Sequence, residues 1–149
     1  MNEFVLALGW AGLYAPMALG AIGSAIGCSI AGQAAIGAMI ETESGHGRYV
    51  GISAMPSSQV IYGIVVMFTL SRANIAEAAA GMFGIGVFAG LALTFSAIHQ
   101  GKCCASAINA AKIKPDIFGL SLAPAAIVEG FAVFAFVFAL VISAGLPAA

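Results

Sequence analysis

The charged residues of this chain are confined to short segments, and four long, nearly uncharged stretches lie between them. The stretches cover residues 4–40, 49–71, 78–101 and 117–149, and Glu129 is the single charged residue within them. A helix needs about 20 apolar residues to cross the hydrocarbon core of a bilayer, so each stretch is long enough. Closed β-barrels also span membranes, but these runs are continuous and do not alternate in short strands. The sequence therefore predicts an all-α membrane protein with four transmembrane helices.

The composition excludes several other classes of protein. Only 7% of the residues are charged, whereas a soluble domain carries about 25%. The net charge of −1 gives no basis for binding nucleic acid. Three cysteines and two histidines form no recognised metal-binding pattern, and we expect the cysteines to pack as small residues; these five residues are Cys28, Cys103, Cys104, His46 and His99.

Short polar segments separate the apolar stretches, which favours antiparallel neighbours and hence two helical hairpins. We expect the first hairpin in residues 1–76 and the second in residues 77–149. The four helices are expected at roughly 11–41, 53–72, 80–112 and 118–145.

The two hairpins resemble each other in sequence. Residues 30–35 of the first correspond in character to residues 99–104 of the second, and Pro56 corresponds to Pro124. Two hairpins joined by an even number of crossings keep the same orientation, as parallel repeats do. The sequence therefore predicts a duplicated hairpin.

The basic residues predict the orientation in the membrane, because cytoplasmic loops carry an excess of Lys and Arg. Arg48 lies in the first loop, and Lys102, Lys112 and Lys114 lie near the third. Arg72 alone lies at the opposite side. We therefore expect a multi-pass protein of the cell membrane with loops one and three in the cytoplasm and both termini outside.

Small residues recur at four-residue spacing on helices one and three, so they share a helix face. Such faces let membrane helices approach closely. Helices two and four carry bulkier side chains. This division favours a two-layered ring of many copies, in which the glycine-rich helices form the inner layer and the bulky helices form the outer, lipid-facing layer. A compact four-helix bundle in a single chain is the alternative. The expected packing residues are Gly23, Gly27, Ala31, Gly86, Gly90 and Gly101.

Glu129 lies well inside the fourth helix. A charge near the centre of a membrane costs at least about 2.5–3.5 kcal/mol, so such residues are functional by default. Desolvation disfavours the charged carboxylate, and a bound proton or cation removes that charge. Glu129 is therefore expected to act as a loading switch. The alternative is a neutral acid that hydrogen-bonds a neighbouring helix.

Helix two offers polar groups at a comparable depth. Met55, Ser58, Gln59 and Tyr62 follow at spacings that place them on one face, and Gln100 on helix three adds a second amide. Hydroxyl, amide and carboxylate oxygens suit a hard cation. Hydrogen bonding between helices is the other interpretation of these groups.

A family resemblance covers nearly the whole chain. The residues that carry it are 27–32, 55–62, 100–102 and 128–129. With these strings, the duplicated hairpin and a carboxylate in helix four only, the chain resembles the proteolipid subunit (the K or c subunit) of bacterial V/A-type rotary ATPases. The resemblance implies a non-catalytic, ion-translocating subunit with no catalytic centre of its own and no organic cofactor.

The resemblance also implies which residues hold the ion. In sodium-dependent members five oxygens bind Na⁺, and a tyrosine hydrogen-bonds the carboxylate. Ser58 stands where threonine is frequent, and the hydroxyl is kept. Na⁺ is therefore favoured over H⁺. By position the ligands are the Met55 carbonyl, Ser58, Gln59, Gln100 and Glu129, with Tyr62 as the residue that holds Glu129.

The mechanism implied by the resemblance is rotary. Identical subunits form a ring in lipid, and each Glu129 loads an ion from one half-channel of a stator subunit and releases it beside a stator arginine. Loops one and three would contact the central stalk. Ion movement would thereby be coupled to ATP hydrolysis or synthesis.

Two other functions compete with this one. A small secondary transporter or channel could use Glu129 as a proton relay, although such proteins more often show inverted repeats and broken helices. A membrane scaffold would leave the cost of a deep acid unexplained. The size of the particle in detergent separates a large ring from a monomer or dimer.

Overall fold

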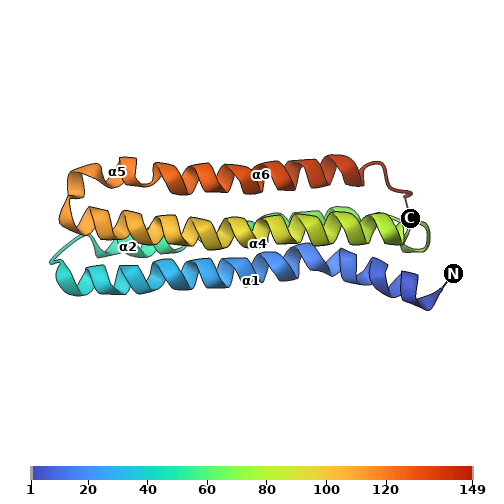
Figure 1. The fold of residues 1–149 in the computed structure, drawn as a ribbon, viewed down its shortest axis with the longest axis horizontal. Coiled ribbons are helices and arrows are strands. Elements are labelled where there is room, and N and C mark those ends of the chain that lie inside the picture. The colour runs from blue at the N-terminus through green and yellow to red at the C-terminus, as the bar shows by residue number, and fades with distance from the viewer. Residues whose placement is uncertain (1, 149) are drawn as a thin grey trace.

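The computed structural model describes residues 2–148, which form four helical segments along one long axis (Figure 1). Each segment is long and apolar enough to cross a membrane. The first and third segments are single helices, and the second and fourth are interrupted. The elements are α1 (Glu3–Glu41), α2 (His46–Ser53), η1 (Met55–Ser57), α3 (Ser58–Leu70), α4 (Ile75–Ile113), η2 (Pro115–Ile117), α5 (Phe118–Ser121) and α6 (Ala123–Ser143).

The two long helices begin earlier than the apolar pattern suggested, at Glu3 and Ile75 rather than near residues 11 and 80. An asparagine N-cap starts each of them: the side chains of Asn2 and Asn74 accept the backbone N–H two residues further on, at 3.1 and 3.0 Å. Such a cap satisfies a donor that the first turn leaves free. Each helix has 39 residues and is about 58 Å long at 1.5 Å per residue, well beyond the roughly 30 Å hydrocarbon core.

The second segment begins at His46, not near residue 53, and the fourth begins with the short helix η2. The loop between α1 and α2 is therefore residues 42–45 alone. Pro56 lies in η1, where the second segment changes from α2 to α3. Because proline has no N–H, the α-helical hydrogen bonding cannot continue unbroken through this position. The predicted hairpin boundary at residues 76 and 77 falls in the first turn of α4.

The tightest packing in the molecule joins α1 and α4, which run parallel and side by side (Figure 1). Glycines make the approach possible: a Cβ atom added to Gly23 would lie 2.5 Å from the Cα of Thr94. A Cβ on Gly27 would likewise meet the backbone of Ala97. The six residues expected to pack helices are all buried, namely Gly23, Gly27, Ala31, Gly86, Gly90 and Gly101.

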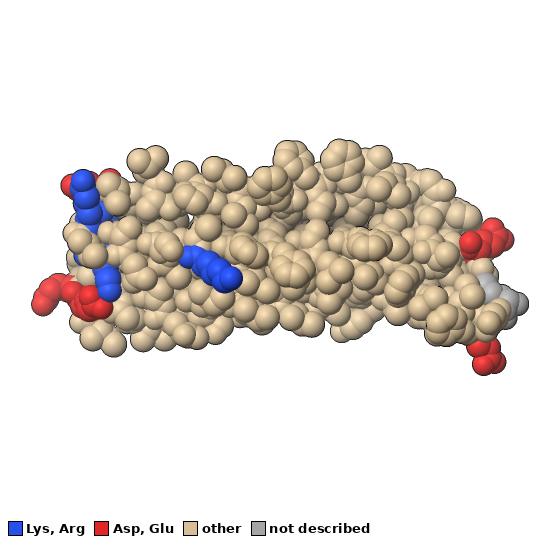
Figure 2. Space-filling model, in the orientation of Figure 1, with Lys and Arg blue, Asp and Glu red and all other residues tan. Residues whose placement is uncertain are grey.

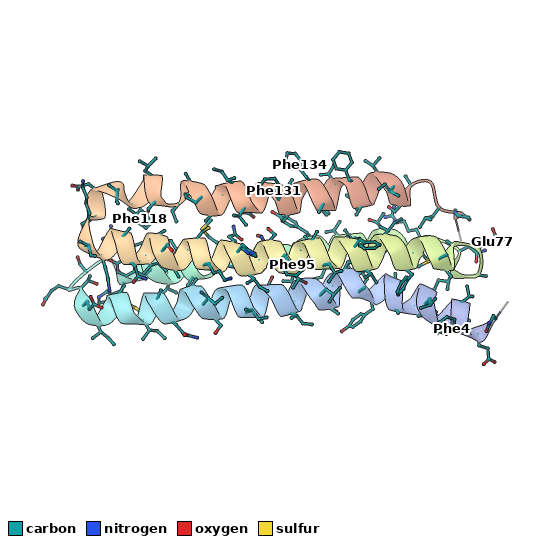
Figure 3. The ribbon with its side chains drawn as sticks, viewed as in Figure 1. Phe4, Glu77, Phe95, Phe118, Phe131 and Phe134 are labelled. Carbon is teal, nitrogen blue, oxygen red and sulfur yellow. The ribbon has the colours of Figure 1, made fainter. Side chains whose placement is uncertain are left out.

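The remaining long helices form a second layer. Helix α3 packs on α1, α6 packs on α4, and α3 also contacts both α4 and α6. The aromatic side chains of Phe131 and Phe134 project outward from α6, with 65% and 61% of their surface exposed (Figure 3). The all-helical, two-hairpin architecture predicted from the sequence is therefore confirmed, with the glycine-rich pair on one side and the bulky pair on the other.

The apolar core consists of two clusters. One surrounds Tyr49 and Ile108 near the ends joined by residues 42–45, and the other surrounds Leu70 and Met82 toward the opposite end. Figure 2 shows charged side chains at the two ends of the molecule and, between the ends, one basic side chain on an otherwise uncharged surface. The polar site described next lies between the two clusters, at mid-length.

Candidate functional site

The site is built around the carboxylate of Glu129 on α6, which is half-buried. The Tyr62 hydroxyl on α3 donates a hydrogen bond to Oε1 at 3.0 Å. The Gln100 amide on α4 donates its Nε2–H to Oε2 at 3.0 Å. Both carboxylate oxygens are thus held, each from a different helix, and the side chain is fixed between three helices.

A second amide extends this network. Gln59 Nε2 donates to Gln100 Oε1 at 2.9 Å, and both glutamines are completely buried. Gln100 Nε2 also lies 3.4 Å from the carbonyl oxygen of Ala125. Because buried polar groups are costly without partners, Gln100 Oε1 needs the donor from Gln59, and Gln59 Nε2 needs this acceptor.

The start of α3 adds the remaining oxygens. Ser58 Oγ lies 3.2 Å from the Met55 carbonyl oxygen and 3.2 Å from Gln59 Oε1. The η1 turn at Pro56 produces this arrangement, because it presents the Met55 carbonyl and the Ser58 hydroxyl together. The structure therefore brings all six predicted site residues into one connected network.

The electrostatics of the site are simple. Within residues 2–148 the ion pair present joins Lys112 to Glu41, at 2.8 Å, and Glu129 has no such partner. The described chain also contains no group of three or more His, Cys, Asp or Glu side chains placed to hold a metal. Glu129 is therefore surrounded by neutral donors and acceptors and contributes the one formal charge of the site.

Two serines that the sequence did not single out support the site. Ser96 Oγ donates to the carbonyl of Val128 at 3.0 Å and so ties α6 to α4 beside Glu129. Ser24 Oγ accepts the backbone N–H of Val60 at 3.2 Å and ties α1 to the start of α3. The available signal was spacing: Ser96 lies four residues before Gln100, on the same face of α4.

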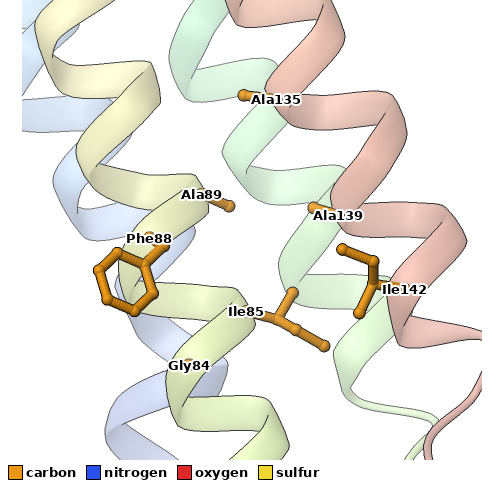
Figure 4. A pocket seen from close by; sticks show the side chains of 7 residues that line it. All are labelled: Gly84, Ile85, Phe88, Ala89, Ala135, Ala139 and Ile142. Carbon is orange, nitrogen blue, oxygen red and sulfur yellow. The ribbon is translucent and has the colours of Figure 1, made fainter.

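A separate groove between α4 and α6 is not part of this site (Figure 4). It has a volume of about 360 Å³ and lies toward the end of the molecule that carries the second apolar cluster. Its lining is apolar throughout and offers no side chain that could hold an ion; the lining residues are Gly84, Ile85, Phe88, Ala89, Ala135, Ala139 and Ile142.

The fold and the site define a membrane protein of two helical hairpins with one half-buried carboxylate in the last helix. The family model for the C subunit of ATP synthase matches the chain twice, at residues 11–70 and 83–142. The chain belongs to this ATP synthase family, and the two matches confirm the predicted duplication. Because the matches are displaced by 72 residues, residues 30–35 correspond to 102–107 and Pro56 to Val128, and the pairing expected from the sequence with residues 99–104 and Pro124 was wrong by three to four residues.

Two relatives resemble this chain over most of its length. The A-type ATP synthase subunit K of Methanocaldococcus jannaschii is 37% identical over 142 residues, which cover 89% of this chain and 62% of the relative. The V-type sodium ATPase subunit K of Enterococcus hirae is 31% identical over 129 residues, which cover 83% of each. The chain thus spans less than two thirds of the archaeal relative. The resemblance to the proteolipid subunit of V/A-type ATPases is confirmed.

Proposed function

We propose that this chain is a rotor-ring subunit of a V/A-type ATPase or ATP synthase, and that each copy carries one monovalent cation on Glu129. Na⁺ is the favoured ion and H⁺ the alternative. The ligands are the Met55 carbonyl, Ser58, Gln59, Gln100 and Glu129, and Tyr62 holds the carboxylate. The chain has no catalytic centre and needs no organic cofactor, because the ATP chemistry belongs to other subunits.

The observation that carries this proposal is the charge of Glu129, which has no ionic partner among residues 2–148. Its two oxygens receive hydrogen bonds from Tyr62 and Gln100, which are both neutral. A bound Na⁺ or H⁺ cancels the charge, whereas a divalent ion would leave a net positive charge in hydrocarbon. Since intramembrane charge is costly, the neutral, loaded form is the one that tolerates lipid.

The preference for Na⁺ rests on the number of oxygens. A proton needs one acceptor, but this site contains carbonyl, hydroxyl and amide oxygens that are linked to one carboxylate through the hydrogen-bonded amides of Gln59 and Gln100. Hard cations are bound by such ligands. Gln100 can serve twice, since an amide both donates through nitrogen and accepts through oxygen. The relative from Enterococcus hirae is named as a sodium ATPase subunit, which agrees with this preference.

The mechanism follows from loading and unloading. Identical subunits form a ring, and a loaded Glu129 travels past lipid until it meets a stator subunit, whose arginine favours the empty carboxylate. Moving one charge through 100 mV is worth about 2.3 kcal/mol, so several ions must cooperate for each ATP. Loops one and three face the cytoplasm and contact the central stalk, and both termini lie outside.

The substitution Glu129→Gln tests the proposal in the assembled complex. It keeps the shape of the side chain and removes its charge, so the ring should assemble while ion-coupled ATP turnover is abolished. Glu77→Gln, in the first turn of α4 at the far end of the molecule (Figure 3), is the matched control and should leave coupled turnover intact. Na⁺- or H⁺-driven transport retained in Glu129→Gln would refute the proposal.

A further inference from the structure

The duplication gives a residue-by-residue equivalence between α1 and α4. The two family matches have equal length, and residue 11 corresponds to residue 83, a displacement of 72. The helices obey the same displacement at both ends, since Glu3 and Glu41 correspond to Ile75 and Ile113. The capping residues Asn2 and Asn74 obey it as well. The helices are therefore two copies of one element.

Each of these equivalent helices has one face that packs against the other, and the equivalent of its partner's packed face remains exposed in the single chain. On α1 the face containing Gly27 contacts α4, at the backbones of Ala97 and Gly101. The equivalent of Gly27 on α4 is His99, and the equivalents of Ala97 and Gly101 on α1 are Ala25 and Ser29. Three of these residues, His99, Ala25 and Ser29, are exposed in the single chain.

The α1–α4 contact joins two different faces of equivalent helices, so it is a heterologous contact, and it leaves one face of each helix free. Repeated heterologous contacts form a closed ring when the rotation from one copy to the next closes on itself. The free face of α4 is then covered by the free face of α1 from a second copy. Applying the same equivalence to the α1–α4 contact places His99 against Ala25 and Ser29 of that copy.

The polar atoms on these two faces are also complementary as hydrogen-bond donor and acceptor. His99 Nδ1 lies 2.8 Å from the Phe95 carbonyl, which can only accept, so Nδ1 carries a proton, and in the neutral imidazole Nε2 is then the acceptor. Ser29 Oγ accepts a hydrogen bond from Gln33 at 3.3 Å, and its own proton has no acceptor among residues 2–148. Both side chains would otherwise face hydrocarbon at a depth where unpaired polar groups are costly.

We propose that His99 forms the contact between neighbouring copies in the ring, with its Nε2 accepting a hydrogen bond from the Ser29 hydroxyl of a second copy. This inference rests on the ring assembly of the proposed function and identifies the residues that join its members. A hydrogen-bonded chain would run from Gln33 through Ser29 of one copy to His99 of the next.

The contact between copies differs from the contact within a chain in one respect. Within the chain Gly23 and Gly27 let the two backbones touch, whereas their equivalents on α4 are Phe95 and His99. Phe95 is 60% exposed and lines a groove of about 330 Å³ between α4 and α6, together with His99 and Ser96. The larger side chains require a wider spacing of the inner helices between copies than within one copy.

Disulfide cross-linking of the full chain in membranes tests this contact. The native cysteines Cys28, Cys103 and Cys104 are replaced by alanine, and the pair Ser29→Cys and His99→Cys is introduced. Mild oxidation should give a ladder of covalent multimers. The matched control pairs His99→Cys with Ala18→Cys, on the same two faces but about 16 Å further along α1, beyond the roughly 7 Å between Cα atoms that a disulfide tolerates.

A second measurement removes any dependence on the cysteine-free background. A photoreactive amino acid is placed at position 99 of the otherwise native chain, and the adducts are mapped by mass spectrometry; they should fall near residues 25–29 of another copy. The size of the particle in detergent is measured in parallel. A large ring without these cross-links, or with equal cross-linking in the control pair, would overturn the His99 contact and leave the proposed function standing. A monomer would overturn both.

Discussion

The hydroxyl of Tyr62 on α3 donates a hydrogen bond of 3.0 Å to the carboxylate of Glu129 on α6, and so links the two hairpins at the middle of the molecule. The Tyr62 ring is itself held by stacking on Phe136, with 5.2 Å between ring centroids. The carboxylate therefore cannot rotate toward lipid or a stator without breaking this bond. In the proposed mechanism the hydrogen bond from Tyr62 holds Glu129 in the ion-loaded conformation.

Replacing Tyr62 by phenylalanine removes the hydroxyl and keeps the stacked ring. Hydrogen bonds to charged groups contribute about 1.5–3 kcal/mol, so the affinity for Na⁺ should fall by about tenfold or more. The measurement is the Na⁺ concentration that half-protects Glu129 from a carbodiimide. Tyr14→Phe, at an exposed position on α1, is the control. Equal half-protection in Tyr62→Phe and the unaltered chain would contradict the role of Tyr62.

Replacing Gln59 by leucine separates sodium binding from proton binding. The change removes an amide oxygen and the donor to Gln100, but leaves Glu129 and its two hydrogen bonds in place. Because a hydrogen bond to a charged group contributes about 1.5–3 kcal/mol and a lost cation ligand should cost about as much, Na⁺ should protect Glu129 about tenfold less well. The dependence of labelling on pH should persist. Asn109→Leu, at an exposed position on α4, serves as reference. Undiminished protection by Na⁺ would remove Gln59 from the ligand set.

The contact between α1 and α4 should be intolerant of a single methyl group. A Cβ at Gly86 would overlap the carbonyl oxygen of Gly12, whereas a Cβ at Gly37 meets nothing within 4 Å. Overpacking of this kind costs about 1–3 kcal/mol. Gly86→Ala should lower the temperature at which the particle dissociates in detergent, and Gly37→Ala should leave it unchanged or raise it. Equal behaviour of the two variants would argue against the close backbone contact.

The orientation in the membrane is testable by labelling from one side. Ser44 and Ser71 lie in loops at opposite ends of the molecule and are both exposed. In a cysteine-free chain, Ser71→Cys should react with an impermeant maleimide in intact cells, and Ser44→Cys should react only in inverted membranes stripped of peripheral subunits. The reverse pattern would invert the proposed topology, in which basic residues cluster near loops one and three.

The sequence predicted the spans and the deep carboxylate because charge exclusion from hydrocarbon is a strong constraint on single residues. The sequence placed the starts of α1 and α4 too late, because a helix begins at its N-cap residue, which can lie beyond the edge of the bilayer. Asn2 and Asn74 act from polar segments that hydropathy treats as loops.

The site was foreseen from residue types and spacing, but its connections were not. That Gln59 donates to Gln100, and Gln100 to Glu129, depends on how far α3, α4 and α6 are rotated against one another. The bonds of Ser24 and Ser96 across helices have the same origin. Serine within an apolar helix usually bonds its own turn. The spacing of Ser96 from Gln100 therefore places the two residues on one face of α4, but it does not predict that Ser96 bonds across to α6.

The decisive measurement is the rate at which a carbodiimide modifies Glu129 in the assembled ring, at fixed pH over a range of Na⁺ concentrations and with K⁺ as control. We predict that Na⁺ slows modification in a saturable manner and that K⁺ at the same ionic strength does not. Modification that responds to pH alone would assign the site to protons. A Glu129 that does not react under any of these conditions would contradict the exchange of a cation at this carboxylate.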